Sequence, residues 1–196
     1  RTGAARLVFY GRMGAPGARR KAKMETGLLQ FYVGDGKGKT TAATGLCLRA
    51  AGHGWQIGFV QFLKDGSSGE IAALSRIPGV RVFPFLSPIK FVFAMSDAEK
   101  AQARLFYDHL WQEILSAVPD LDLLVLDEIF GAIETGMVEE GQLKDLFLHK
   151  PAGLELVLTG RHPTAATAQS ADYLMEIRSH RHPYDKGVSA REGIEW

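Results

Sequence analysis

The sequence predicts an α/β fold in which a mainly parallel β-sheet is flanked by helices in a single domain. Two observations carry this prediction. Short apolar runs alternate with segments of helical periodicity, and the first apolar run leads through a glycine-rich loop directly into a helix. A length of 196 residues and a hydrophobic content of 46% are typical of one globular domain with a sizeable core.

Six apolar segments are expected to form the strands. They are residues 28–33, 55–63, 80–85, 121–128, 154–160 and 172–178. Two helices are expected, one over residues 40–51 and a long one that begins after Ser96 and ends near Ala117. The long helix opens with a capping box, in which Ser96 pairs with Glu99. Its apolar side chains recur at four-residue spacing: Phe106, Leu110 and Ile114.

Basic residues are unevenly placed along the chain. Residues 1–23 contain seven Lys or Arg, no acidic residue and no helical or strand periodicity. We expect this segment to be either a disordered native tail or an expression remnant ahead of a start at Met24, so that the folded domain spans 24–196. This remainder has 16 basic against 22 acidic residues, a net charge of −6. That charge argues against a broad nucleic-acid-binding face.

Cysteine content and hydropathy bear on the compartment. The single cysteine, Cys47, cannot form an internal disulfide, and no uncharged run reaches the roughly 18 residues that cross a bilayer. A secretory signal pattern is also missing from the sequence. We therefore expect a cytoplasmic protein without a membrane segment, in which Cys47 belongs to the core.

The glycine-rich loop reads G-D-G-K-G-K-T at residues 34–40 and joins a strand to a helix. This context is typical of a phosphate-binding P-loop, in which backbone N–H groups at a helix N-terminus surround an anion. It predicts a P-loop NTPase-like (RecA-like) fold that binds ATP. The ATP contacts expected from this stretch are Gly34, Asp35, Gly36, Lys37, Gly38, Lys39, Thr40 and Thr41. We expect Lys39 to face solvent and supply charge; the alternative is a flexible surface turn.

This loop is one residue shorter than the usual pattern G-x-x-x-x-G-K-[ST]. Three rather than four residues separate Gly34 from Gly38, so we expect a tighter turn that holds the nucleotide differently. A kinase needs the γ-phosphate to face the acceptor, whereas chemistry at the ribose needs the 5′-carbon exposed. Both orientations are compatible with the spacing.

Asp127 and Glu128 end the fourth expected strand. P-loop folds hold Mg²⁺ with a carboxylate at such a strand end and with the hydroxyl of the loop, so Thr40, Asp127 and Glu128 are the predicted Mg²⁺ site. The alternative is a strand end that meets solvent.

For the remaining histidines and lysine that stand out in the sequence, we expect structural rather than functional roles. His180 and His182 are too few to make a zinc site. His53 is expected at a helix end, and Lys186 is expected to be a loop charge.

From about residue 27 to residue 196 the chain resembles the P-loop ATP:cob(I)alamin (corrinoid) adenosyltransferases. The matching motifs are G-D-G-K-G-K-T-T-A-A (34–43), R-A-A-G-H-G (49–54), V-Q-F-L-K (60–64), V-L-D-E (125–128), L-T-G-R (158–161) and H-P-Y-D-K-G-V-S-A-R-E-G-I-E-W (182–196). The shortened loop together with the C-terminal motif is the most specific part. The resemblance implies transfer of the 5′-deoxyadenosyl group of ATP to the Co(I) centre of a corrinoid, such as cob(I)yrinic acid a,c-diamide or cob(I)alamin, with release of tripolyphosphate.

Several residue roles follow from this resemblance. Co(I) is itself the nucleophile, so no catalytic side chain is expected and the protein positions the reactants. Arg161 would add positive charge at the triphosphate, and Glu195 would meet the ribose hydroxyls. Phe91 and Phe93, in K-F-V-F where family members often carry G-F-T-W, would pack near the lower face of the corrin. The alternative for this pair is ordinary core.

The resemblance also implies partners: Mg²⁺, an external electron donor such as a reduced flavoprotein, and a second copy in a homodimer. Two other functions fit the same loop. One is a P-loop ATPase or kinase, in which Glu128 positions water or Asp127 accepts a proton. The other is an ATP-dependent regulator that binds a partner.

Overall fold

A six-stranded parallel sheet forms the centre of the molecule. The structure is a computed structural model that describes residues 24–87 and 90–195, so the segment 1–23 lies outside the described residues. The strands are β1 (Leu29–Val33), β2 (Ile57–Gln61), β3 (Val80–Val82), β4 (Leu123–Asp127), β5 (Glu155–Thr159) and β6 (Tyr173–Glu176). Their order is β3-β2-β4-β5-β1-β6, and every neighbouring pair is parallel. The predicted P-loop NTPase-like α/β class is confirmed.

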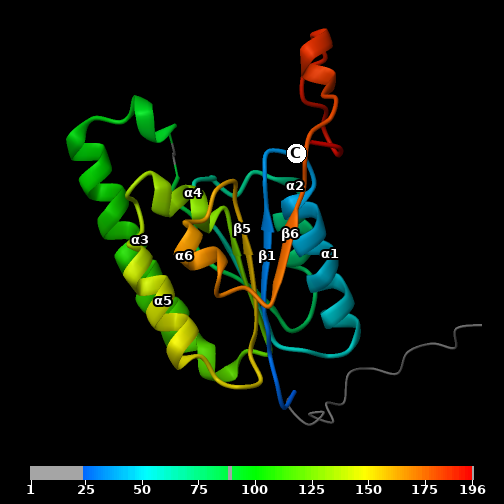
Figure 1. Cartoon of the computed structure of the whole chain (residues 1–196), viewed down its shortest axis with the longest axis vertical. Coiled ribbons are helices and arrows are strands. Elements are labelled where there is room, and N and C mark those ends of the chain that lie inside the picture. Colours follow the sequence, from blue (N-terminus) through cyan, green and yellow to red (C-terminus); the bar gives the residue numbers. More distant parts are fainter. Residues whose placement is uncertain (1–23, 88–89, 196) are drawn as a thin grey trace, which may run out of the picture.

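Helices cover both faces of this sheet (Figure 1). One face carries α1 (Lys39–Gly52) and α2 (Gly69–Leu74). The opposite face carries α3 (Asp97–Ala117), α4 (Ile129–Glu134), α5 (Glu140–His149) and α6 (Ala165–Ala168). Three short 3-10 turns complete the described elements: η1 (Val92–Ala94), η2 (Val118–Asp120) and η3 (Pro183–Lys186). The result is a three-layer sandwich.

Alternation along the strands builds a core on each face. In β4, Leu124 and Leu126 pack toward α3 and α5, whereas Leu123 and Val125 pack toward α1. Successive side chains of a strand point to opposite faces, and both faces are covered, so every residue of the inner strands β2, β4 and β5 is buried, while the inner strand β1 alternates between buried and partly buried residues. The edge strand β6 differs, because its Tyr173 and Leu174 are half exposed.

Local sequence signals locate the long helix well and the strand ends less well. The capping box of Ser96 and Glu99 is present at the start of α3, and Leu110 and Ile114 are buried as expected. The strands expected over 55–63 and 80–85 are shorter, since apolar side chains stay buried after the chain has left the sheet. Phe62 and Phe83 are two such side chains.

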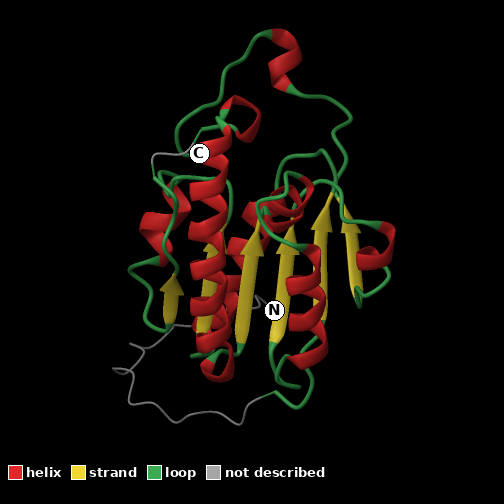
Figure 2. Cartoon of the chain, turned by 90° about the vertical axis from the view of Figure 1, so that its left-hand side faces the viewer, coloured by secondary structure: helices red, strands yellow, loops and turns green. Residues whose placement is uncertain are grey.

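All strands point the same way, so their carboxyl ends share one edge of the sheet (Figure 2). The loops after β1, β2, β4 and β5 meet along this edge, which is where parallel α/β folds bind ligands. Residues 179–195 project beyond the same edge (Figure 1), and residues 193–195 return to line a cavity beside α1. None of the helices in the described ranges combines the length and apolar character needed to span a membrane.

Candidate nucleotide-binding site

The loop between β1 and α1 is folded around a lysine side chain. Lys39 is only 8% exposed, and its Nζ donates to the carbonyl oxygens of Gly34 (2.7 Å) and Gly36 (2.9 Å). The expectation that Lys39 faces solvent is therefore wrong, because the side chain turns back beneath the loop and helps to shape it. Burial lowers the pKa of Lys39, and the charge of Glu128 opposes that effect.

Glycines in this loop meet two separate demands. Gly34 and Gly38 have φ angles of 103° and 118°, a region that glycine adopts at little cost. At Gly36 the requirement is the absence of a side chain. Its N–H donates to the carbonyl oxygen of Ile177 at 2.8 Å, and a Cβ would lie 2.7 Å from that same oxygen. The loop therefore packs closely against the backbone that follows β6.

Asp127, at the end of β4, holds several side chains of the site in place. It is completely buried, so the alternative that the acidic pair is a strand end meeting solvent is wrong for this residue. Four side chains donate to its carboxylate: Thr40 Oγ1 (2.9 Å) and Thr159 Oγ1 (2.7 Å) to Oδ1, and Gln61 Nε2 (3.2 Å) and Lys64 Nζ (3.0 Å) to Oδ2. Asp127 therefore fixes the position of the Thr40 hydroxyl.

Glu128 sits in a strained backbone conformation beside Asp127. Its φ is 60°, uncommon for a residue other than glycine, and its N–H donates to Thr159 Oγ1 at 2.9 Å. Burial raises the pKa of Glu128, and the neighbouring charge of Asp127 adds to the rise. Strained backbone conformations of this kind are found more often at functional sites than elsewhere.

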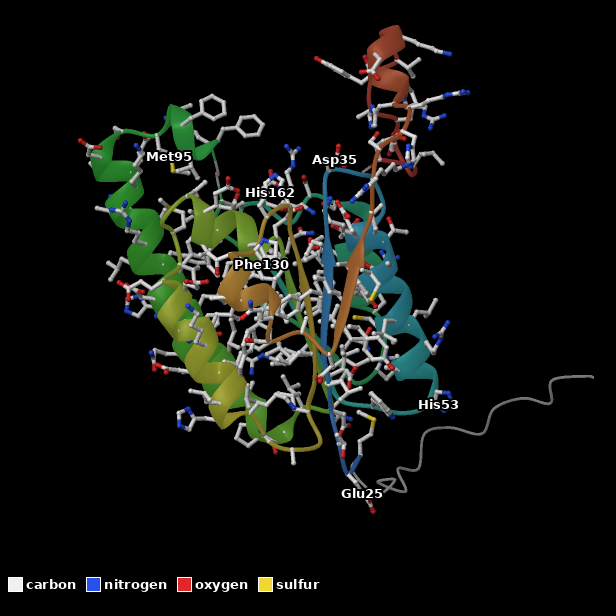
Figure 3. The ribbon with its side chains drawn as sticks, viewed as in Figure 1. Glu25, Asp35, His53, Met95, Phe130 and His162 are labelled. Atoms are coloured by element: carbon white, nitrogen blue, oxygen red, sulfur yellow. The ribbon has the colours of Figure 1, made fainter. Side chains whose placement is uncertain are left out.

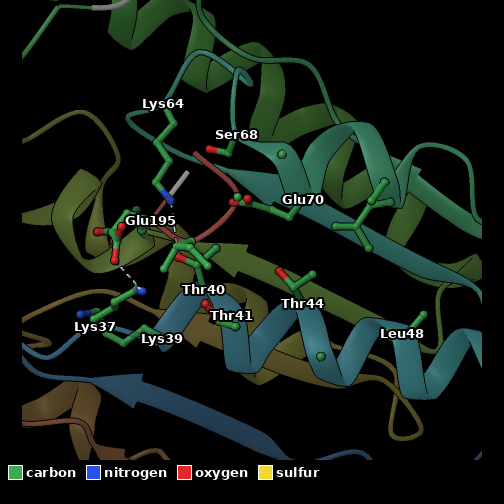
Figure 4. A pocket seen from close by; sticks show the side chains of 18 of the residues that line it. Lys37, Lys39, Thr40, Thr41, Thr44, Leu48, Lys64, Ser68, Glu70 and Glu195 are labelled. Carbon is green, nitrogen blue, oxygen red and sulfur yellow. Dashed lines mark hydrogen bonds and ion pairs between the residues drawn. The ribbon is translucent and has the colours of Figure 1, made fainter. Parts of the chain in front are cut away.

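A cavity of about 940 Å³ opens from the loop and runs along α1 toward α2 (Figure 4). The loop residues 36–41, Lys64, Glu128 and Glu195 line its polar end, and Leu48 and Ile77 belong to its apolar end. Its volume is at the upper end of the range for small-molecule sites. The α1 N-terminus and the lysines beside it make the polar end suitable for phosphates.

Glu195 lines the polar end of this cavity and is held by two cations. Lys37 Nζ lies 3.0 Å from its Oε1 (Figure 4), and Arg191 binds the same carboxylate at 3.1 Å. Hydrogen bonds from Arg191 lower the pKa of Glu195 to about 2. An ionised carboxylate at this position is suited to accept hydrogen bonds from hydroxyl groups.

Not all predicted ATP contacts share this cavity. Gly34, Asp35 and Arg161 line a second cavity of about 430 Å³, which also includes His162 and Arg178. Asp35 accepts a hydrogen bond from the N–H of Ser179 at 3.3 Å. Figure 3 shows Asp35 and His162 at the same end of the sheet. The charge of Arg161 nonetheless contributes to the lowered pKa of Lys39 and opposes the rise in the pKa of Glu128.

The predicted Mg²⁺ ligands fit a magnesium ion by their chemistry. Magnesium prefers oxygen ligands and keeps several of its waters, so it needs few protein groups. Thr40 and Glu128 present a hydroxyl and a carboxylate at the cavity wall, while the oxygens of Asp127 already accept four hydrogen bonds. The described residues include no group of three or more His, Cys, Asp or Glu positioned to hold a metal.

Lys64 is a site residue that sequence reasoning missed. Its Nζ lies 3.0 Å from Asp127 and 3.4 Å from the Thr40 hydroxyl, and it lines the cavity beside α1. The available signal was its place just after a central strand, at the carboxyl edge. Leu63 before it has a φ of 56° and donates its N–H to the Tyr107 hydroxyl at 3.1 Å.

Phe91 and Phe93 are surface residues. They are 77% and 86% exposed and stack on each other, with ring centroids 5.4 Å apart and planes 12° apart. The alternative that this pair is ordinary core is therefore wrong. Both line a cavity of about 440 Å³ next to Leu63. Met95, at the end of the same turn, lies on the α3 side of the carboxyl edge (Figure 3).

The histidines occupy separate places. His53 caps the carboxyl end of α1, as expected, and lies at the opposite end of the molecule from Asp35 (Figure 3). His180 lines the second cavity, and His182 Nδ1 accepts from the N–H of Tyr184 at 3.2 Å.

Comparison with known proteins identifies relatives of this chain. The family described as ATP:corrinoid adenosyltransferase BtuR/CobO/CobP matches residues 25–196. The corrinoid adenosyltransferase of Pseudomonas aeruginosa is 32% identical over 179 residues, which cover 90% of this chain and 87% of that protein. Those of Salmonella typhimurium (30% over 176 residues, 90% and 89%) and Escherichia coli K12 (29% over 178 residues, 90% and 89%) are similar to the same extent. The chain therefore belongs to the ATP:corrinoid adenosyltransferase family.

Proposed function

We propose that this protein transfers the 5′-deoxyadenosyl group of ATP to the Co(I) centre of a corrinoid and releases intact tripolyphosphate. The observation that carries the proposal is the cavity beside the shortened loop, whose polar end is lined by lysines and by Glu195. In the transfer, the electron pair of Co(I) forms the cobalt–carbon bond. The bond between the 5′-carbon and its oxygen breaks, and its electrons leave with the tripolyphosphate.

Positioning and charge are what the protein supplies to this step. Lys37, Lys39 and the N–H groups of the loop would bind the phosphates, and Lys64 and Arg161 would add positive charge. Thr41, exposed at the start of α1, would bond a phosphate oxygen. Burial raises the pKa of the only thiol, Cys47, to about 12, so it is not a nucleophile at neutral pH.

Thr40 and Glu128 would hold Mg²⁺, and Asp127 would orient the Thr40 hydroxyl. Bound there, the ion would neutralise part of the charge on the leaving tripolyphosphate. Glu195 would accept hydrogen bonds from the ribose hydroxyls.

The exposed pair Phe91 and Phe93 would pack against the lower face of the corrin. We further propose that an external donor such as a reduced flavoprotein supplies the electron that makes Co(I), and that the protein works as a homodimer in the cytoplasm.

Phosphorus NMR tests the proposal in one incubation. The protein is mixed with ATP, Mg²⁺ and chemically pre-reduced cobalamin, and the phosphorus products are compared with the adenosylcorrinoid seen in the visible spectrum. Tripolyphosphate should appear mole for mole with adenosylcorrinoid, with little ADP or orthophosphate when corrinoid is omitted. ADP and orthophosphate that accumulate regardless of corrinoid would indicate an ordinary P-loop ATPase. ATP binding without turnover of any reduced corrinoid would indicate a regulator.

A further inference from the structure

The last described residues form a closed turn around the carboxylate of Glu195. Arg191 donates to this carboxylate from its backbone N–H (2.8 Å) and its Nε (3.1 Å), both to Oε2, and from its Nη2 (3.1 Å) to Oε1. In return, the N–H of Glu195 donates to the carbonyl oxygen of Arg191 at 2.9 Å. The guanidinium therefore binds both carboxylate oxygens as a planar fork, which fixes the direction of the carboxylate.

The rest of the protein gives Glu195 little other support. Every residue from 178 to 194 is exposed. Within the described ranges, two hydrogen bonds join residues 179–195 to the remainder of the chain. They run from the Ser179 N–H to Asp35 Oδ1 at 3.3 Å, and from Lys37 Nζ to Glu195 Oε1 at 3.0 Å (Figure 4). Asp35 and Lys37 both belong to the β1–α1 loop, so this segment is attached to the loop that borders the cavity.

The carboxylate of Glu195 already has a full set of donors. An ionised carboxylate offers about four acceptor positions. Oε2 accepts two hydrogen bonds from Arg191, and Oε1 accepts one from Arg191 and one from Lys37. A ribose hydroxyl can therefore bond to Glu195 only when one donor leaves. Arg191 is held by several bonds of the same turn, whereas Lys37 makes a single bond and lies at the loop where phosphates would bind.

We infer that Arg191 positions the Glu195 carboxylate for the ribose of the nucleotide, and that Lys37 leaves this carboxylate for the triphosphate when the nucleotide binds. This inference rests on the proposed function, since it assumes that ATP occupies the cavity with its ribose at Glu195. A triphosphate carries more negative charge than one carboxylate, so it is the stronger partner for Lys37. The exchange frees a position on Oε1 for a ribose hydroxyl, while Arg191 keeps the carboxylate in place.

Calorimetric titration in the absence of corrinoid tests this inference, because no transfer then takes place. The probes are Mg–ATP and Mg–2′,3′-dideoxy-ATP, which lacks both ribose hydroxyls. The parent protein should bind ATP at least about tenfold more tightly, because the analogue cannot donate to the charged carboxylate. Arg191→Ala should bring the two dissociation constants to within about threefold of each other, by weakening the binding of ATP alone. A purely structural role of Arg191 would weaken both nucleotides equally.

Three further variants separate positioning from exchange. Lys37→Met should lower the affinity for both nucleotides by the same factor, about tenfold, because each loses a charged contact to phosphate. The preference for ATP should remain, since Arg191 still holds Glu195. Arg191→Lys keeps the charge but not the fork, so it should retain only part of the preference. Lys186→Ala removes an exposed cation from the same segment and should change neither dissociation constant. Circular dichroism melting checks that each variant is folded.

The outcomes separate the inference from the proposed function. Equal affinities of the parent for the two nucleotides, or an equal loss of both in Arg191→Ala, overturn the role of Arg191 even where phosphorus NMR shows adenosyl transfer. An ATP affinity that Lys37→Met leaves unchanged or raises overturns the exchange. A parent protein that binds no ATP and forms no adenosylcorrinoid overturns the proposed function as well.

Discussion

At the scale of single residues, Lys39 combines two roles that the loop motif alone does not distinguish. Its ammonium group donates to the carbonyl oxygens of Gly34 and Gly36, and it also provides positive charge at the wall of the cavity beside α1. Lys64 similarly pairs with the buried Asp127 while it lines that cavity. The two lysines that carry positive charge in this site therefore also help to fix the conformation of the loop and the position of Asp127.

Replacement of Lys39 should consequently affect both ATP binding and stability. In Lys39→Met we expect ATP affinity to fall at least about tenfold, because a charged contact to phosphate is lost. We also expect the free energy of unfolding to fall by about 1–3 kcal/mol, because two carbonyl oxygens lose their buried donor. Calorimetric titration with ATP and denaturant unfolding measure the two effects.

Lys144→Met, which removes a partly exposed lysine from α5, is the matched control for this change and should alter neither quantity appreciably. Unchanged ATP affinity in Lys39→Met would contradict the P-loop assignment. Unchanged stability would contradict the structural role of its two hydrogen bonds.

At the scale of elements, the β1–α1 loop depends on β6 as much as on its own glycines. Gly34 and Gly36 both approach the carbonyl oxygen of Ile177, which follows β6, so closely that a Cβ would lie 2.5 Å and 2.7 Å from it. The β1–α1 loop and the chain that follows the edge strand are thus packed closely against each other. A change in one should be transmitted to the other.

Gly36→Ala should therefore destabilise the protein by roughly 1–3 kcal/mol, as overpacking in a tight site does, and weaken ATP binding at the same time. Denaturant unfolding and ATP titration measure both. The control is Gly141→Ala in α5, where an added Cβ meets nothing within 4 Å. That change should be neutral or stabilise by up to about 1 kcal/mol. A Gly36→Ala protein as stable as the parent would show that the loop has no such close contact.

At the scale of the whole molecule, the reactivity of the single thiol shows whether the core between α1 and the sheet is closed. Cys47 is fully buried, and burial raises its pKa to about 12. The folded protein keeps this proton at a pH where the unfolded chain loses it. The contribution of Cys47 to stability is therefore complete below the ordinary thiol pKa and declines as pH rises toward 12.

A thiol reagent should accordingly react with Cys47 only when the protein unfolds. At pH 8 we expect almost no reaction of the native chain with Ellman's reagent, and one equivalent in guanidinium, with a rate that follows the unfolding transition. Rapid labelling of a protein whose circular dichroism is native would show that this core is open.

The sequence determined the features that depend on neighbours in the chain. Apolar runs of the right length predicted the parallel sheet, because strands buried on both faces are continuously apolar. The glycine loop between a strand and a helix predicted the P-loop, and Ser96 with Glu99 predicted the start of α3. Each of these signals is contained within a few consecutive residues, so it can be read without knowledge of the fold.

Tertiary structure decided the features that depend on distant residues. Lys64 meets Asp127 only because β2 and β4 are neighbours in the sheet, although 63 positions separate the two residues. Alternating aromatics at 91 and 93 suit a buried strand and an exposed turn equally, and only packing places them at the surface. Lys39 is buried because the loop folds over it. In each case the environment of a side chain depends on how distant elements pack against one another. Local sequence patterns contain no information about that packing.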